Sequence, residues 1–149
     1  MNKLTKSLFI GAISFGVLAA SVNAQAESKY QEQKVVYHVN YDEDKRHNGM
    51  LGNIQNHING VGADRLTVNV VMHGSGIELL RKAKTDPQAQ AKIDNLKSQG
   101  VEFKVCANTM RGHGLTVDDL YDAKADDVVP AGVAEVAYLQ QQGFVYLRP

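Results

Sequence analysis

The sequence has a single cysteine and no tryptophan, and its positive and negative charges cancel. A lone cysteine cannot form an internal disulfide, which excludes a small secreted scaffold held together by disulfides. The absence of tryptophan, with only 7% aromatic residues, argues against a platform on which single-stranded nucleic acid stacks. Internal repeats and low-complexity segments are absent too, so the length of 149 residues favours one domain.

The zero net charge conceals an asymmetry at the start of the chain. Residues 1–24 carry Lys3 and Lys6 and no acidic residue, so the remainder has 14 basic and 16 acidic side chains. This nearly balanced remainder has no electrostatic footprint for nucleic acid or for an anionic membrane surface. We therefore expect neither of them as a partner.

Residues 1–24 have the three parts of a secretory signal peptide. The two lysines are followed by an uncharged apolar run, Leu8 to Ala20, and then by small residues that favour cleavage after Ala24 or Ala26. A membrane-spanning helix needs about 20 apolar residues, so cleavage is favoured over a retained anchor. We expect a periplasmic protein with a flexible leader at 25–33 and one domain at 34–149.

Apolar segments alternate with helical patterns along that domain, and 44% hydrophobic content is enough for a core. Short runs rich in β-branched residues predict strands at 34–40, 66–72, 101–106, 128–130 and 144–147. Apolar residues at helical spacing predict helices at 50–61, 77–82 and 133–142, and residues 42–48 read as a polar loop.

Two helix starts carry their own signals. Asp86 is a predicted N-cap with Pro87 at the first helical position, and Gly100 ends that helix. Thr116 and Asp119 form the pattern of a capping box, which predicts another short helix.

Strands that alternate with helices specify an α/β fold with a mostly parallel five-stranded sheet. We predict a three-layer α/β/α sandwich of flavodoxin-like architecture. Open sheets of this kind bind ligands at the carboxyl ends of their strands. That rule selects Asn40, the segment from His73 to Gly76 and the segment from Cys106 to His113 as candidate site residues.

Cys106 ends a predicted strand, and Asn108 or Thr109 is a candidate N-cap for a helical turn directly after the thiol. A helix N-terminus and a nearby Arg111 would both stabilise a thiolate. Free cysteines are also among the most buried residue types, so an inert core residue is the alternative. From the residues alone, the two interpretations are balanced.

The histidines also have two interpretations each. His113 is a candidate acid or base for the thiol or a residue of a glycine-flanked surface loop. His73 ends a strand and could reach the same crevice, or it could be a loop histidine bonded to backbone. His38 lies inside a strand, where a hydrogen-bonded core histidine is expected.

Other chemistries are weakly supported. Gly74-Ser75-Gly76 before a helix could hold a phosphate, but the full glycine pattern and a Walker lysine are missing. No pair of histidines or cysteine has the close spacing of a zinc motif, and no serine nucleophile elbow is present. We therefore predict no metal and no cofactor.

Four blocks together resemble the DsrE/DsrF-like family, and the resemblance covers the chain from about Lys34 to its end. The blocks are Val36-Tyr37-His38-Val39-Asn40, Asn53-Ile54-Gln55-Asn56-His57-Ile58, Val70-Val71-Met72-His73-Gly74 and Val101-Glu102-Phe103-Lys104-Val105-Cys106-Ala107-Asn108-Thr109. The resemblance implies the same α/β sandwich and a homo-oligomer, such as a dimer, trimer or hexamer.

The best understood members of this family, including the DsrE and TusD subunits, are sulfur-relay proteins that carry a persulfide on a cysteine at a strand end. Cys106 resembles that cysteine, which favours a sulfur carrier that exchanges sulfur with a partner protein or a small sulfur compound. The alternatives are a non-catalytic oligomeric binding module with Cys106 in the core, and a protein that binds a small ligand or metal through its histidines.

Overall fold

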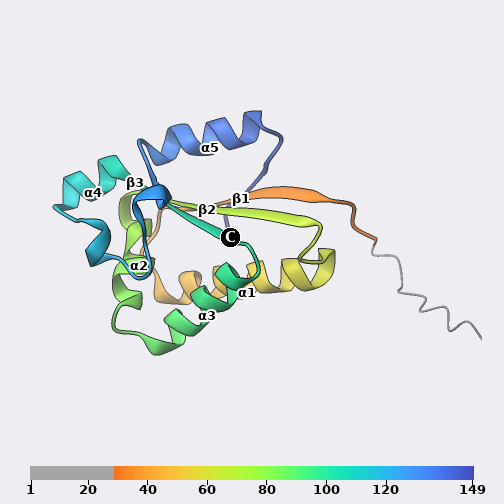
Figure 1. Ribbon diagram of the computed structural model, residues 1–149, viewed down its shortest axis with the longest axis horizontal. Coiled ribbons are helices and arrows are strands. Elements are labelled where there is room, and N and C mark those ends of the chain that lie inside the picture. The colour runs from red at the N-terminus through yellow and green to blue at the C-terminus, as the bar shows by residue number, and fades with distance from the viewer. Residues whose placement is uncertain (1–28) are drawn as a thin grey trace, which may run out of the picture.

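The computed structural model describes residues 29–149, in which five strands alternate with helices (Figure 1). The predicted signal peptide and its cleavage sites lie outside the described residues. The elements are β1 (Gln33–Val39), α1 (Asp44–Val61), β2 (Leu66–Met72), a 3₁₀ helix (Gly74–Ile77), α2 (Glu78–Ala83), α3 (Pro87–Ser98), β3 (Glu102–Cys106), α4 (Ala107–His113), 3₁₀ helices at Val117–Asp119 and Ala125–Asp127, β4 (Val128–Val129), α5 (Gly132–Gln141) and β5 (Val145–Leu147).

The five strands form one sheet in the order β4-β3-β2-β1-β5, and every pairing in it is parallel. Each strand is connected to the next through helical segments, as parallel pairing requires. The predicted α/β class with a flavodoxin-like parallel sheet is confirmed. All strands point the same way, so their carboxyl ends meet at one edge.

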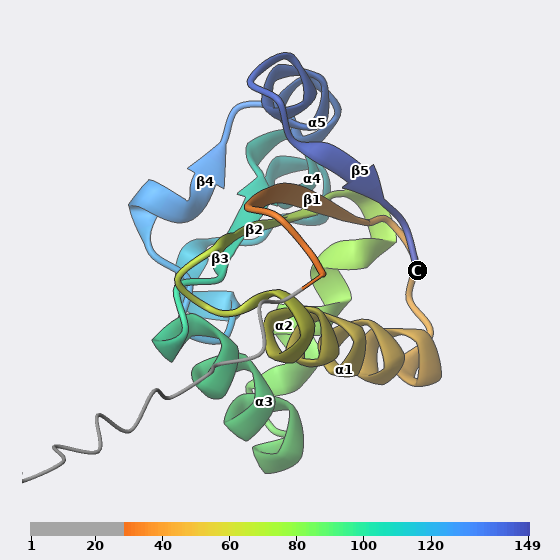
Figure 2. The ribbon, with the colours of Figure 1, turned by 90° about the vertical axis from the view of Figure 1, so that its right-hand side faces the viewer.

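The helices cover the two faces of the sheet unequally. In Figure 2, α5 lies on one side of the sheet, and α1 and α3 lie on the other. Side chains of β1 alternate between the layers: Val35, Tyr37 and Val39 join the large core under α1, whereas Val36 joins a small cluster under α5. The α5 face therefore has little apolar cover and leaves room for polar side chains.

The polar loop predicted at 42–48 is wrong for most of its length, because α1 begins at Asp44. This first turn carries few apolar side chains, so periodicity places the helix start too late. His47 is buried there, and its Nε2 lies 2.7 Å from the carbonyl oxygen of Tyr41. A polar side chain thus occupies a core position that the apolar pattern could not reveal.

The two predicted helix starts are confirmed. The Asp86 carboxylate accepts hydrogen bonds from the N–H groups of Gln88 and Ala89 and caps α3. Thr116 and Asp119 form the capping box, which opens a 3₁₀ helix. Among residues 29–149, no helix is long and apolar enough to cross a membrane.

Candidate functional site

Cys106 is the last residue of β3 and the N-cap residue of α4, and its side chain is 4% exposed. The strand passes directly into the helix, because Ala107 already has helical geometry. The predicted N-cap at Asn108 or Thr109 is therefore wrong: both residues lie inside the first turn. Their backbone N–H groups are among those that an α-helix leaves without an internal partner.

Polar hydrogens surround the sulfur of Cys106. The pKa of the thiol is lowered by the backbone N–H of Gly132, then by the hydroxyl and N–H of Thr109 and the N–H of Asn108. Burial by itself raises the pKa of the thiol, but these donors together outweigh it and the pKa is lowered. Two helix starts, those of α4 and α5, converge on the sulfur and favour its thiolate form.

The orientation of the Thr109 hydroxyl is fixed by the neighbouring loop. Its oxygen accepts a hydrogen bond of 2.9 Å from the backbone N–H of Gly74. A hydroxyl that accepts from one side keeps its own hydrogen for another acceptor. The Thr109 hydroxyl is also one of the groups that lower the pKa of the Cys106 thiol. The segment after β2 therefore supports the thiol through Thr109.

His73 and Cys106 both pack closely against Gly132, which has no side chain. A Cβ on Gly132 would lie 2.8 Å from the Cβ of His73 and 3.3 Å from the Cβ of Cys106. The sheet register also brings these two residues close. Met72 of β2 pairs with Val105 of β3, and His73 and Cys106 are the next residues along the chain. The sheet register therefore places His73 and Cys106 at the ends of neighbouring strands, and both residues lie against Gly132.

A second imidazole contacts His73. The Nε2 atoms of His38 and His73 are 2.6 Å apart, and the rings are stacked with centroids 4.7 Å apart. On its other side, His38 Nδ1 lies 2.7 Å from the hydroxyl oxygen of Tyr146 on β5. The expectation of a hydrogen-bonded core histidine is confirmed only in part: His38 is hydrogen-bonded on both sides, but it is half-buried and not a core residue.

Both imidazoles are held in the neutral form near neutral pH. Burial lowers the pKa of His73, and burial lowers that of His38, with further lowering by the charges of His73 and Arg148. A neutral imidazole can accept a proton, and a thiol of lowered pKa can give one. The arrangement therefore suits a nucleophilic sulfur with proton-exchanging groups nearby.

Comparison with known proteins identifies the family. The sequence profile of the DsrE/DsrF-like family matches residues 33–149. The chain belongs to the DsrE/DsrF-like family. The chain is also similar to a solved structure, that of the protein of unknown function MTH1491 from Methanobacterium thermoautotrophicum. The two sequences are 29% identical and the TM-score is 0.68. The match covers 79% of this chain and 100% of the other. No curated protein matches the chain significantly.

Not all predicted site residues of this DsrE/DsrF-like chain lie at the thiol. Cys106, His73, Gly74, Asn108 and Thr109 are brought together as described above. Arg111 donates to the side-chain oxygen of Asn108, and its side chain is exposed. His113 is the last residue of α4, about 9 Å along the helix axis from Ala107 at its start.

The remaining predicted ligand residues have structural partners. Asn40 accepts two hydrogen bonds from Arg148. In the glycine segment, the N–H of Gly74 binds Thr109 and that of Gly76 binds the carbonyl of His73, while Ser75 is exposed within the 3₁₀ helix. Two backbone N–H groups of the segment considered for phosphate binding, those of Gly74 and Gly76, are thus already hydrogen-bonded within the protein.

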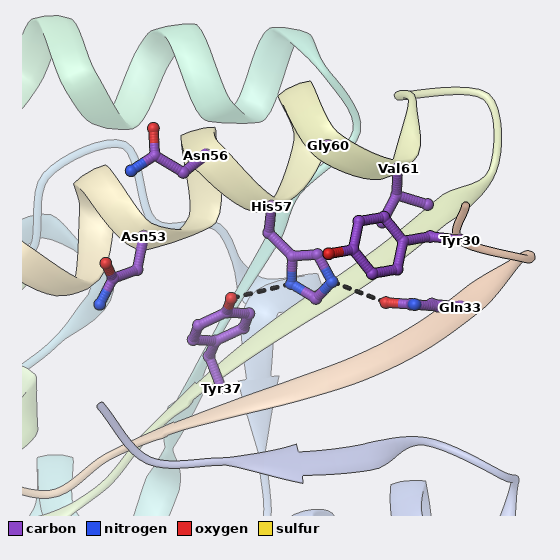
Figure 3. A pocket seen from close by; sticks show the side chains of 8 residues that line it. All are labelled: Tyr30, Gln33, Tyr37, Asn53, Asn56, His57, Gly60 and Val61. Atoms are coloured by element: carbon purple, nitrogen blue, oxygen red, sulfur yellow. Dashed lines mark hydrogen bonds between the residues drawn. The ribbon is translucent and has the colours of Figure 1, made fainter. Parts of the chain in front are cut away.

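A cavity of about 420 Å³ lies far from the thiol, at the amino end of β1 beside the last turns of α1. His57 spans it: its Nδ1 is 2.9 Å from the Tyr37 hydroxyl and its Nε2 is 2.7 Å from Gln33 Oε1 (Figure 3). Burial raises the pKa of Tyr37 to about 12 and lowers that of His57, so the network is uncharged. The sequence did not reveal it, because its residues come from a strand and a helix without a shared motif.

One group of potential metal ligands occurs in residues 29–149, formed by Asp42, Asp44 and His47. The ammonium of Lys82 already lies 2.6 Å from Asp42 and 3.0 Å from Asp44. His47 Nε2 is bonded to a backbone carbonyl. This group is explained as an ion-pair cluster at the start of α1.

The protein is expected to lose stability as the pH falls through and below 6.5. The folded-state pKa values of His38, His57 and His73 are lowered from 6.5, so the unfolded chain binds more protons just below that pH and stability rises with pH there. Thermal unfolding should give a Tm that is several degrees lower at about pH 5 than at about pH 7, a range in which ordinary aspartates stay charged. The same Tm at both pH values would contradict lowered pKa values for these three histidines.

Proposed function

We propose that this protein is an exported sulfur carrier that holds sulfane sulfur as a persulfide on Cys106. The observation that carries the proposal is the buried thiol whose pKa is lowered by donors from two helix starts. Membership of the DsrE/DsrF-like family, which suggests sulfur relay at the family level, supports the same chemistry. The predicted signal peptide at 1–24 supports a periplasmic location.

The carrier reaction needs no cofactor and no net oxidation. The Cys106 thiolate attacks the outer sulfur of a small persulfide, R–S–S–H. A bond forms between Cys106 and that sulfur, the S–S bond of the donor breaks, and the thiolate R–S⁻ leaves and takes up a proton. A second thiol then removes the sulfur from Cys106 by the same exchange, which makes the protein a carrier.

Mass spectrometry of the intact protein tests this proposal directly. After treatment with glutathione persulfide, the wild type should gain the mass of one or more sulfur atoms, and a reducing thiol should remove the gain. The Cys106→Ser variant should gain nothing under the same conditions. A wild type without added sulfur, or an equal gain in the variant, would refute the carrier function.

The exposed fraction of only 4% supports a second candidate, an oligomeric binding module in which Cys106 is a core residue. In that case iodoacetamide would modify Cys106 only after unfolding. Val133 and Tyr138, which are exposed on α5, offer apolar surface for either kind of homo-oligomer. Light scattering on the purified chain gives the number of copies.

The variant Thr109→Val is expected to raise the pKa of the Cys106 thiol. The substitution removes the hydroxyl donor to the sulfur, and one hydrogen bond is worth up to about one pH unit. The pH dependence of alkylation measures the shift. Thr109→Ser keeps the hydroxyl and should titrate like the wild type; equal midpoints in all three proteins would show that the hydroxyl has no part in the shift.

A further inference from the structure

Three polar side chains form a continuous chain across the α5 face of the sheet. Tyr146 Oη lies 2.7 Å from His38 Nδ1, and His38 Nε2 lies 2.6 Å from His73 Nε2. They come from β5, from β1 and from the residue after β2. Tyr146, at the outer end, is 38% exposed, whereas His73, at the inner end, packs with Cys106 against Gly132.

The contact between the two Nε2 atoms fixes how protons are distributed along this chain. One of the two neutral imidazoles must donate and the other must accept. In one state, Tyr146 donates to His38, His38 donates to His73, and His73 carries its hydrogen on Nδ1. In the other, every bond is reversed and His73 Nδ1 has a free lone pair. Exchange between the states moves one proton along the whole chain.

No carboxylate in the described part of the chain binds either imidazole, so no fixed negative charge holds the pair in the charged form. Arg148 acts on His38 and lowers its pKa. The other ionisable side chains are Lys34 and Lys104 on the same sheet face, Glu102 paired with Lys104, and Glu135 and Tyr138 on α5. The pair is therefore free to take up and release a proton.

We propose that His73 exchanges a proton with the Cys106 site and that His38 and Tyr146 are positioning residues that hold His73 and relay this proton to the exposed edge of the sheet. The inference rests on the proposed function of Cys106. The Cys106 thiol gives its proton to the histidine pair, and the thiolate attacks the outer sulfur of the persulfide donor. The donor's leaving thiolate then takes up a proton from the same pair, so protons balance over the transfer.

The matched variants Tyr146→Phe and Tyr138→Phe test the relay. Both remove one hydroxyl from an exposed tyrosine, but only Tyr146 is bonded to His38. The rate of Cys106 alkylation by iodoacetamide, followed against pH, should show one inflection from the thiol and a lower one from the histidine pair. Tyr146→Phe should move the lower inflection by up to about one pH unit.

Tyr138→Phe should leave the profile unchanged, and Tyr146→Phe should also slow loading from glutathione persulfide severalfold. Superimposable alkylation profiles for the wild type and Tyr146→Phe would overturn the relay even if both proteins load sulfur. A wild type that does not take up sulfur would refute only the carrier function. The alkylation experiment uses no sulfur donor, so it still measures how the histidine pair affects the Cys106 thiol.

Discussion

Replacing Gly76 with alanine is expected to lower the free energy of unfolding by about 3 kcal/mol or more, at the upper end of the cost of overpacking a core. A Cβ at this position would lie 2.0 Å from the carbonyl oxygen of Val39 and 2.5 Å from its carbonyl carbon. Backbone atoms cannot rotate away as a side chain can, so β1 or the 3₁₀ helix must move.

The movement would also reach the candidate site. The Val39 carbonyl accepts a hydrogen bond of 3.1 Å from the N–H of His73, and the His73 carbonyl accepts one of 3.0 Å from Gly76. Displacing Val39 therefore strains the bond that holds His73 at the end of β2. We expect a folded fraction, if one persists, to show altered alkylation of Cys106 as well.

Urea unfolding measures the loss as a lower midpoint with an unchanged slope. Gly52→Ala on α1 is the matched control, because a Cβ there meets nothing within 4 Å and the residue is helical. This control should be neutral or stabilising by up to about 1 kcal/mol, since alanine favours the helix. A Gly76→Ala protein within about 0.5 kcal/mol of the wild type would show that the close approach is not a constraint.

The strands could be predicted because each is a short run rich in β-branched or aromatic residues. The strand at Leu66–Met72 has the predicted ends, and the strand at Gln33–Val39 is displaced by one residue. The rule that sites gather at the carboxyl ends also predicts Cys106 and His73 in one region, and the structure places both against Gly132. The hydrophobic pattern and the parallel sheet topology are therefore enough to predict the strands and the region of the site.

The contacts of His38 could not be predicted in the same way. Its partners His73 and Tyr146 are 35 and 108 residues away in the chain, so their approach depends on the parallel register of β1 with β2 and β5. The donors to the sulfur include the N–H of Gly132, a backbone group that any residue type carries. Hydrogen bonds from backbone N–H groups therefore cannot be predicted from the residue types.

Replacing Gly132 with alanine is expected to damage the thiol site more than the fold. The new Cβ would lie 2.8 Å from the Cβ of His73 and 3.3 Å from that of Cys106, and neither atom is the end of a flexible side chain. Either His73 or the start of α5 must shift. We expect a loss of about 1 to 3 kcal/mol in the free energy of unfolding.

The effect on Cys106 follows from the same displacement. The Gly132 N–H is the strongest of the donors that lower the pKa of the thiol, so moving it should raise that pKa by up to about one unit. The pH dependence of alkylation reports this shift, and persulfide loading near neutral pH should slow. Gly112→Ala on α4, where a Cβ meets nothing within 4 Å, is the control and should keep the wild-type profile. An unshifted thiol in Gly132→Ala would mean that the start of α5 does not tune the sulfur, and that the α4 donors alone account for its acidity.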